Sequence, residues 1–520
     1  MKSLIVLSLL IYLIATQENC RFAFEYTQKE LQSDPKKVQE FLSKVMKWES
    51  NFAKDLGIDK KSGLTLDGQQ LDVNTGMPYG KPHQFTASSK ESIHLALIGL
   101  ALSNNEYAKQ IYSEEEALDL LNRKINTYEQ FDKDYPGYGG FLPWVAVNDG
   151  VVTPTWDWTD GVPSLDNGQL FWAAYAVVSV LETWYSDQEE LIGRYTRFYQ
   201  KMANNSITIF YEGDGLIRAV TRIQDIKASV ENNKYTNRQT DCTNFRSPCY
   251  LDDPYEGELF AWMMYFYAPW KDTTEREKIW VAKKSKLQVV DYKVAGLNKY
   301  ISVQRGWWFS AHEQWKYLFL PYTHDQIQLN LLINGEKVRT WDARNNEKPG
   351  MFASITSNIT KNEDPVDYYS ACGIQEVSFI PVSYRHLVTP YSTMTMFLAN
   401  QEVAVSWYHN MISGPAGQNA FGSTEGVVVD GTSVAPFVTW DSKMTTVLGM
   451  AGGIFDYTAK KLNSEGNYNL FLKVLNREWQ QSFSNLKGAD VPFAYPNVTF
   501  PQIKKDFTTC TRKTDIIIEQ

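Results

Sequence analysis

The sequence predicts a mainly α-helical protein in which two layers of helices surround a central cavity. Three segments carry this prediction, because each starts on polar, cap-type residues and then becomes apolar on nearly every side. They are Ser88–Leu102, Asp166–Trp184 and Glu256–Tyr267. A helix that is apolar all round is buried on both sides. We therefore expect these helices to form an inner ring that a second ring covers from outside.

Small β additions and long loops complete the predicted fold. Strand-like stretches occur at 376–380 and 435–439, but an all-β protein would need many more short strands at regular spacing. Loop-like segments rich in Gly, Pro, Asp and Trp lie at 137–163 and 413–430. The chain of 520 residues exceeds an ordinary domain, yet a helical barrel can use that length in one unit. One domain over residues 21–520 is the expectation.

The N-terminus has the pattern of a signal peptide. A short basic start is followed by the uncharged apolar run Leu4–Ile14 and then by polar residues. This run is too short to span a bilayer but suits a secretory signal. We predict a signal peptide over residues 1–20, cleaved between Thr16 and Cys20; an uncleaved anchor is the alternative. No later stretch is long and apolar enough to span, so we expect a soluble mature chain without membrane contact.

Three N-glycosylation sequons agree with export, at Asn204, Asn358 and Asn497, although such tripeptides also arise by chance. The expected localisation is extracellular, with the lumen of a lytic compartment as the alternative.

The five cysteines allow two disulfides. Cys20 either leaves with the signal peptide or becomes the new N-terminus. Cys242 and Cys249 bracket a short polar loop and form the favoured pair, and Cys372 with Cys510 then follows by elimination.

Charge and aromatic content narrow the class of partner. The net charge of −9, with scattered Lys and Arg, argues against a nucleic-acid partner. Aromatic residues make up 14% of the chain, with 16 Trp and 30 Tyr. Trp and Tyr offer flat apolar faces with a polar handle, on which sugar rings can stack. Most of these side chains belong to the core, so the informative ones are the Trp in Gly- and Asp-rich loops.

The sequence lacks the motifs that several other kinds of enzyme chemistry require. The chain has no phosphate-binding loop, and 422–426 is no nucleophile elbow because its Ser is not central. The six histidines lack metal-ligand spacing. The sequence thus predicts neither a metal nor a cofactor, and we expect a monomer.

Carboxylates beside aromatics remain as the candidate chemistry. Cleaving a glycosidic bond needs one acid to protonate the leaving oxygen and a second carboxylate to activate water or attack the sugar. Four carboxylates crowd the helix start at 252–258, where repulsion and partial burial should raise at least one pKa. The alternative is an acidic first turn that the helix dipole favours. Asp441, beside Trp440 and before another helix, is the second candidate; a plain N-cap is its alternative.

Two further segments suit substrate binding. Trp and Asp alternate at 156–160, and Asp166 follows at a helix start, where an N-cap is again the alternative. Polar and aromatic groups also run together at 312–316 and at Tyr322, although a surface charge run is equally consistent with that pattern.

Taken in order, these segments resemble the endo-β-1,2-glucanases of glycoside hydrolase family 162 and, more distantly, the related bacterial endo-β-1,2-glucanases. The resemblance runs from about Ser88 to Gly453. The segments that carry it are GYGGFLPW (137–144), SLDNGQLFWAAYA (164–176), DPYEGELF (253–260), SAHEQWKYLFLPY (310–322), FGSTEG (421–426) and TWDSK (439–443).

The resemblance implies an (α/α)6 barrel and an inverting endo-hydrolase that cuts linear β-1,2-glucan to sophorose-type oligosaccharides. It places the general acid on Glu256 or Glu258 and the general base on Asp441, and it implies a proton relay through a substrate hydroxyl. An inverting pair leaves about 6.5–9.5 Å for water, and a relay permits more. The residues expected in sugar subsites are Trp144, Trp156, Asp157, Trp158, Asp166, His312, Glu313, Trp315, Tyr322, Glu425 and Trp440.

Two other hypotheses on the function remain open. One is another (α/α)6 carbohydrate enzyme, acting on a different β-glucan or as a lyase; the negative charge argues against the polyanionic substrate of a lyase. The other is a secreted sugar-binding protein without catalysis.

Overall fold

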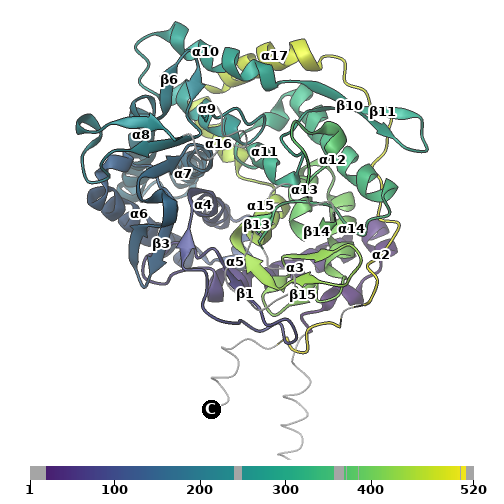
Figure 1. Cartoon of the computed structure of the whole chain (residues 1–520). Coiled ribbons are helices and arrows are strands. Elements are labelled where there is room, and N and C mark those ends of the chain that lie inside the picture. Colours follow the sequence, from purple (N-terminus) through teal and green to yellow (C-terminus); the bar gives the residue numbers. More distant parts are fainter. Residues whose placement is uncertain are drawn as a thin grey trace, which may run out of the picture.

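Helices dominate the structure, a computed structural model that describes residues 19–238, 249–356, 368–369, 372–383, 386–503 and 505–510. Figure 1 shows them arranged as a ring around a central opening. The helices are α2 (Gln28–Ser33), α3 (Pro35–Asn51), α4 (Ser88–Leu102), α5 (Ala108–Ile111), α6 (Glu114–Asp134), α7 (Leu165–Trp184), α8 (Glu189–Phe210), α9 (Gly257–Tyr267), α10 (Thr273–Lys283), α11 (Lys316–Phe319), α12 (Gln326–Asn345), α13 (Met396–Ala399), α14 (Gln401–Ile412), α15 (Thr445–Met450), α16 (Phe455–Ser464) and α17 (Tyr468–Phe483).

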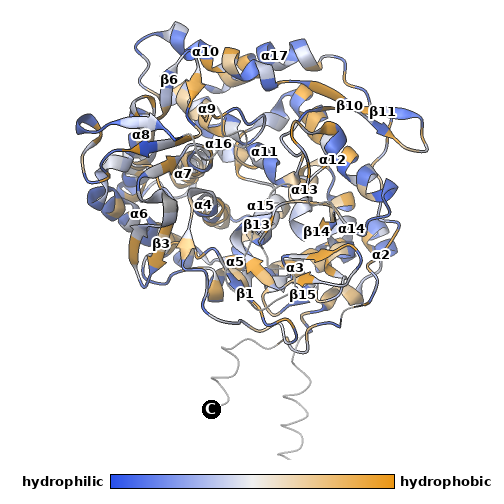
Figure 2. Cartoon of the chain, viewed as in Figure 1, coloured by the Kyte–Doolittle hydropathy of each residue, from blue (hydrophilic) through white to orange (hydrophobic). Residues whose placement is uncertain are grey.

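The three helices expected to be buried are present, and their bounds differ from the prediction by no more than one residue. Almost every residue of α4, α7 and α9 is buried, and α7 packs against both of the others. Helices such as α3, α6 and α8 bury only one stripe. Figure 2 shows hydrophilic and hydrophobic residues mixed along peripheral helices such as α10 and α17. Helices buried on every side and helices buried along one stripe form an inner and an outer layer, as predicted.

The contact between α7 and α9 is unusually close at the end of the barrel that carries the cavity described below. A Cβ atom on Gly168 would lie only 2.5 Å from the backbone nitrogen of Phe260, so no larger residue fits there. This approach brings the first turn of α7 against the first turn of α9.

In the described residues, strands form only two- and three-stranded sheets, all antiparallel. The pairings are β1 (Gly68–Gln70) with β19 (Phe437–Thr439), β2 (Phe85–Thr86) with β3 (Val145–Asn148) and β4 (Val151–Pro154), β5 (Gly161–Pro163) with β8 (Val220–Ile223) and β9 (Tyr235–Asn237), β6 (Tyr211–Gly213) with β7 (Leu216–Ile217), β10 (Val289–Val294) with β11 (Lys299–Gln304), β12 (Ile355–Thr356) with β13 (Tyr368–Tyr369), β14 (Leu387–Val388) with β17 (Gly426–Val428) and β18 (Val434–Ala435), and β15 (Gln418–Asn419) with β16 (Gly422–Ser423).

The predicted strand at 435–439 is confirmed as the end of β18 followed by β19, whereas the one at 376–380 is wrong. There the chain forms a 3-10 turn, Gln375–Val377, and only Ser378 makes an isolated bridge, to Gly306. Its apolar side chain Val377 packs into a local core instead of alternating across a sheet.

A disulfide between Cys20 and Cys510 joins the two ends of the described chain, with Cα atoms 5.5 Å apart. The pairing of Cys372 with Cys510 is therefore wrong: Cys372 is a free, buried thiol, and elimination failed because it left Cys20 out. Cys249 is disulfide-bonded, and its expected partner, Cys242, lies outside the described residues.

The signal-peptide segment, residues 1–18, and the sequon at Asn358 also lie outside the described residues. Asn204 and Asn497 are exposed, as attachment of a glycan requires. Within the described ranges, no helix combines the length and the apolar character needed to cross a membrane.

Candidate active site

A cavity of about 680 Å³ opens at the end of the barrel where α4, α7 and α9 begin. Side chains from these helix starts, from the β1–β19 edge and from the turn Ala311–Trp315 line it. The lining residues are Asp67, Lys81, Pro82, His83, Gln84, Phe85, Ser89, Lys90, Trp144, Thr155, Trp156, Leu165, Asp166, Gln169, Glu256, His312, Trp315, Tyr368, Tyr391 and Asp441.

Asp441 reaches the cavity from a π-helical turn, Trp440–Met444, that follows β19 directly. Thr439 caps this turn, so the N-cap role considered for Asp441 belongs to its neighbour two residues earlier. Trp440 is fully buried: its indole N–H donates to the carbonyl of Gly57 (2.6 Å) and its backbone N–H to the carbonyl of Asp67 (3.0 Å). Trp440 therefore anchors the turn in the core and lies outside the cavity lining.

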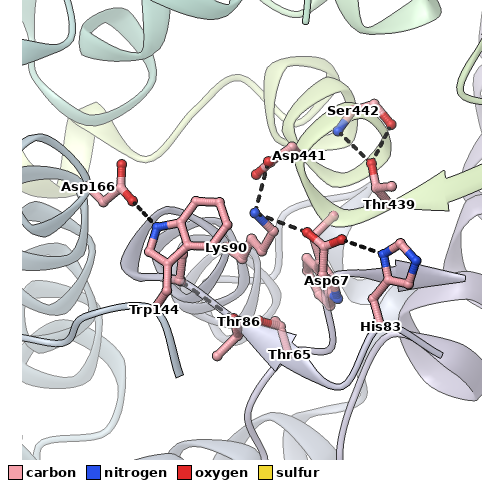
Figure 3. A network of polar contacts seen from close by, with 12 residues as sticks. Thr65, Asp67, His83, Thr86, Lys90, Trp144, Asp166, Thr439, Asp441 and Ser442 are labelled. Carbon is pink, nitrogen blue, oxygen red and sulfur yellow. Dashed lines mark hydrogen bonds and ion pairs between the residues drawn. The ribbon is translucent and has the colours of Figure 1, made fainter. Parts of the chain in front are cut away.

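Lys90, in the first turn of α4, joins two carboxylates of the cavity (Figure 3). Its ammonium nitrogen lies 2.9 Å from Asp441 Oδ2 and 3.2 Å from Asp67 Oδ1. The other oxygen of Asp67 is 3.0 Å from His83 Nδ1. Burial alone would lower the pKa of Lys90, but these two carboxylates raise it above its ordinary value. Lys90 therefore stays positively charged in the lining of the cavity.

Lys90 affects the two carboxylates unequally. Burial raises the pKa of Asp441, and the charge of Lys90 opposes that rise without cancelling it. At Asp67 burial acts the same way, yet Lys90 and His83 together hold the pKa of the carboxyl below its ordinary value. Asp67 is thus the carboxyl that ionises more readily, and Asp441 is the more basic of the two.

Glu256 lies at the N-cap of α9 and faces the same cavity. One of its oxygens accepts a hydrogen bond from the side-chain amide of Gln169 (3.1 Å) on α7. Among the described residues no cation pairs with it. Burial and the nearby carboxyls of Asp253 and Asp166 raise its pKa well above the ordinary glutamate value, so the protonated form is favoured.

Glu258, two residues further, lies outside the cavity lining. It is fully buried, 2.9 Å from the ammonium of Lys316, and it accepts a hydrogen bond from the Tyr322 hydroxyl (2.6 Å). The same contacts hold Tyr322 in the core rather than in the lining. A carboxylate with a dedicated buried cation has a structural role.

Aromatic side chains form one wall of the cavity. Phe85 and Trp144 stack with ring centres 5.6 Å apart, and Trp156 meets Phe85 edge-on at 4.5 Å. Trp156 is 57% exposed and has a left-handed backbone (φ 50°), which is uncommon outside glycine and recurs at functional positions. Trp158 stacks behind Trp144 and lies outside the lining, and the side chain of Asp157 lies outside the described residues.

Asp166 lines the cavity beside this wall and accepts a hydrogen bond from the Trp144 indole (3.3 Å). It lies in the first turn of α7 and makes no cap contact, because Ser164 is the residue at the N-cap position. Burial raises the pKa of Asp166 to about 6, with Lys90 opposing and Asp441 adding to the rise.

The segment 310–316 divides between the cavity and the core. His312 and Trp315 line the cavity, and Trp315 donates to the hydroxyl of Tyr391 (2.8 Å). Burial, with Arg339 nearby, lowers the pKa of His312 to about 4, so the ring is neutral.

Two further carboxylates expected in subsites are buried away from the lining. Glu313 accepts backbone N–H bonds from Trp307, Trp308 and Ser310 and so shapes the turn. Glu425 accepts from the hydroxyl of Thr439 (2.9 Å) and supports the turn that carries Asp441.

Several lining residues were not predicted from the sequence, above all Asp67, His83, Lys90 and Gln169. A lysine three residues into an otherwise apolar helix is the one signal that was available. The others lie in unremarkable polar sequence and reach the cavity through contacts between segments far apart in the chain.

Together these groups offer a carboxyl that favours its proton, a carboxylate held by a lysine, and an aromatic wall. This set can donate a proton on one side of a bound sugar and activate a water on another.

Comparisons with known proteins agree with this chemistry. The family model of endo-β-1,2-glucanase SGL, glycoside hydrolase family 162, matches residues 64–511. The endo-β-1,2-glucanase from Talaromyces funiculosus, solved with sophorose and, as a Glu→Gln variant, with β-1,2-glucan, is 35% identical. It aligns over 95% of this chain and 100% of its own at a TM-score of 0.89.

A more distant structure shows the fold alone. The endo-β-1,2-glucanase from Chitinophaga pinensis is 11% identical, with 85% of this chain and 98% of that chain covered at a TM-score of 0.56. No curated protein sequence matches the chain. The chain is thus an (α/α)6-barrel glycoside hydrolase that belongs to the endo-β-1,2-glucanase family, glycoside hydrolase family 162.

Proposed function

We propose that this protein is a secreted endo-β-1,2-glucanase that hydrolyses linear β-1,2-glucan to sophorose-type oligosaccharides with inversion at the anomeric carbon. The observation that carries the proposal is that one cavity holds Glu256, a carboxyl with a raised pKa and no cation partner in the described residues, together with Asp441, a carboxylate held by Lys90 from a distant turn. The Talaromyces relative, solved with β-1,2-glucan and with sophorose, supports the choice of substrate.

Glu256 is the general acid in this proposal. Its raised pKa favours a proton on the carboxyl, and a carboxyl that faces the cavity and has no cation partner in the described residues can pass that proton toward the leaving oxygen, directly or through a substrate hydroxyl. Glu258 was the other candidate; its contacts with Lys316 and Tyr322 argue against it.

Asp441 is the general base. Lys90 occupies one of its oxygens, and the other, Oδ1, is buried without a hydrogen-bond partner in the described residues. A water held by that oxygen would be activated for attack on the face of the sugar opposite the acid. The aromatic wall of Phe85, Trp144 and Trp156 would stack against the sugar faces.

Secretion is supported by the signal-like N-terminus and by the Cys20–Cys510 disulfide, because such bonds persist in oxidising compartments. If the signal peptide is removed, Cys20 can form this bond only when cleavage falls before it, as predicted.

The test is a panel of linear β-glucans of different linkage given to the purified protein, with the anomer of the first product followed by NMR. We expect cleavage of β-1,2-glucan alone, with release of the α-anomer. Cleavage of another linkage, or release of the β-anomer, would contradict the proposal. Binding of the glucan without any cleavage would point instead to a sugar-binding protein.

A further inference from the structure

The described part of the cavity contains more negative than positive groups. Four carboxyls line it, those of Asp67, Asp166, Glu256 and Asp441, against a single buried cation, Lys90. Lys81, the other lysine of the lining, is exposed. The placement of one buried charge therefore decides which carboxyl is ionised.

The backbone fixes this placement from three separate elements. Lys90 projects from the first turn of α4 and is 2% exposed. Asp67 precedes β1 and is held on both sides: its N–H donates to the carbonyl of Phe85 (2.7 Å), and its carbonyl accepts from Trp440 (3.0 Å). Because Trp440 directly precedes Asp441, Asp67 and Asp441 are tied to each other through one backbone hydrogen bond as well as through Lys90. Figure 3 shows the ammonium of Lys90 between the carboxylates of Asp441 and Asp67.

Asp441 uses its two oxygens differently as a result. Oδ2 lies 2.9 Å from the ammonium of Lys90, whereas Oδ1 has no hydrogen-bond partner in the described residues. Such a buried acceptor needs a partner in the working protein, and water in the cavity can supply one. Lys90 thereby fixes which oxygen faces the water.

We propose that Lys90 and Asp67 act together as a positioning pair for Asp441: Lys90 orients its carboxylate and keeps it ionised, and Asp67 offsets the charge of Lys90 so that Asp441 remains a useful base. The inference rests on the proposed role of Asp441 as general base. Lys90 alone would stabilise the carboxylate so strongly that it would accept a proton poorly. Asp67 shares the same ammonium and restores the proton affinity of Asp441.

The groups that face Lys90 and Asp441 are Asp67, Asp166, Glu256 and Tyr368, with His83 on the far side of Asp67. A general base must be deprotonated to act, so the rate falls as the pH drops through its pKa. Removing the positive charge raises that pKa and moves this acidic limb to higher pH. Removing the Asp67 charge lowers the pKa and moves the limb to lower pH.

The experiment measures kcat and KM on linear β-1,2-glucan across pH for Lys90→Met and Asp67→Asn. We expect opposite displacements of the acidic limb. On the wild-type acidic limb, Lys90→Met should lose about 10-fold or more in kcat, the effect of removing one close opposite charge. Asp67→Asn should instead lower the plateau kcat, because its base is weaker. If the acidic limb moves in the same direction in both variants, or does not move in either, the proposal is overturned.

Controls separate this effect from damage to the fold and from failure of the proposed function. Lys90→Arg keeps the charge and should keep the wild-type limb even where kcat drops; it also serves if Lys90→Met does not fold. Lys124→Met breaks another buried pair of the same helix, with Glu91, and should leave the limb in place. Asp441→Asn, measured in parallel, tests the base itself: full activity there overturns the proposed function, whereas loss there with unmoved limbs in the other variants overturns only the positioning pair.

Discussion

Glu256 and Glu258 lie two residues apart at the start of one helix, yet the barrel gives them opposite environments. Glu256 faces the cavity, has no cation partner in the described residues, and has a strongly raised pKa. Glu258 is fully buried against Lys316 and Tyr322 on the other side of the helix start. Two identical side chains within one helical turn thus take a proposed catalytic role in one place and a structural role in the other.

The same contrast holds for the wider barrel. Several carboxylates in the core have a dedicated cation, as in Glu91 with Lys124 (2.6 Å) and Glu336 with Arg339 (2.7 Å), and Glu313 is held by backbone N–H groups instead. In the described lining of the cavity, Asp67 and Asp441 share Lys90, and no cation pairs with Glu256. Facing the cavity, rather than burial as such, therefore distinguishes the carboxyls that we propose as catalytic, because the core acids are equally buried.

Replacing Glu256 by Gln should have the largest effect. The amide keeps the shape and cannot donate the catalytic proton, so we expect kcat on β-1,2-glucan to fall about 10²–10⁴-fold. The melting temperature should stay at or above the wild-type value, since a raised carboxyl pKa shows that the charged form is not stabilised there. Calorimetry beside the kinetic assay checks both; a variant that is inactive because it is unfolded would remove the contrast.

Glu258→Gln should do the reverse. It leaves Lys316 as a buried charge without its partner, which costs about 3–5 kcal/mol of unfolding free energy. Urea unfolding of this variant against Glu256→Gln measures the difference directly. Unchanged stability together with lost activity would exchange the roles we assign to the two glutamates.

The pH profile should reflect the cavity and not the core. Because the pKa of Glu256 is raised, its proton is kept at pH values where an ordinary glutamate has lost it, and is lost as the pH rises through that pKa. The wild-type kcat should fall on that basic limb. Stability should decline over the same range, because a carboxyl whose folded-state pKa is raised favours the fold only while it is protonated. Thermal melts at matched pH would show this decline, and Glu256→Gln should flatten it.

The smallest expected effect concerns the two exposed tryptophans. Trp156 at the cavity is 57% exposed, and Trp184 at the far end of α7 is 61% exposed. Trp156→Ala should raise KM about 2- to 10-fold through lost stacking, with a smaller change in kcat. Trp184→Ala is the matched control and should leave both constants alone; equal effects would argue against a subsite at Trp156.

The fold was largely predictable because buried helices carry their signal locally. Ser88–Leu102 is apolar all round whatever it packs against, and the observed helix has the same bounds. The strand predicted at 376–380 was wrong because five residues are too few to show a clear periodicity. Packing against the surrounding core decides their conformation instead. The predicted disulfide pairing was wrong for a similar reason. Cys20 and Cys510 are 490 positions apart, so the local sequence does not indicate that they pair.

The site was predictable only in part. Acid crowding at 252–258 and the Trp-Asp pair at 440–441 indicated where carboxyls would gather. Local sequence could not separate Glu256 from Glu258, because the partner that distinguishes them, Lys316, lies 58 positions away. Asp67 and Lys90 were missed likewise, since only the β1–β19 pairing brings Asp67 beside the turn of Asp441.

The most direct test of the central claim compares leaving groups. An aryl glycoside of a β-1,2-linked glucose oligomer with a dinitrophenolate leaving group needs no protonation, whereas the glucan does. If Glu256 is the general acid, the loss of kcat/KM in Glu256→Gln should be at least about 10-fold smaller on the aryl substrate than on the glucan. An equal loss on both substrates, or this selective pattern in Glu258→Gln instead, would contradict the account.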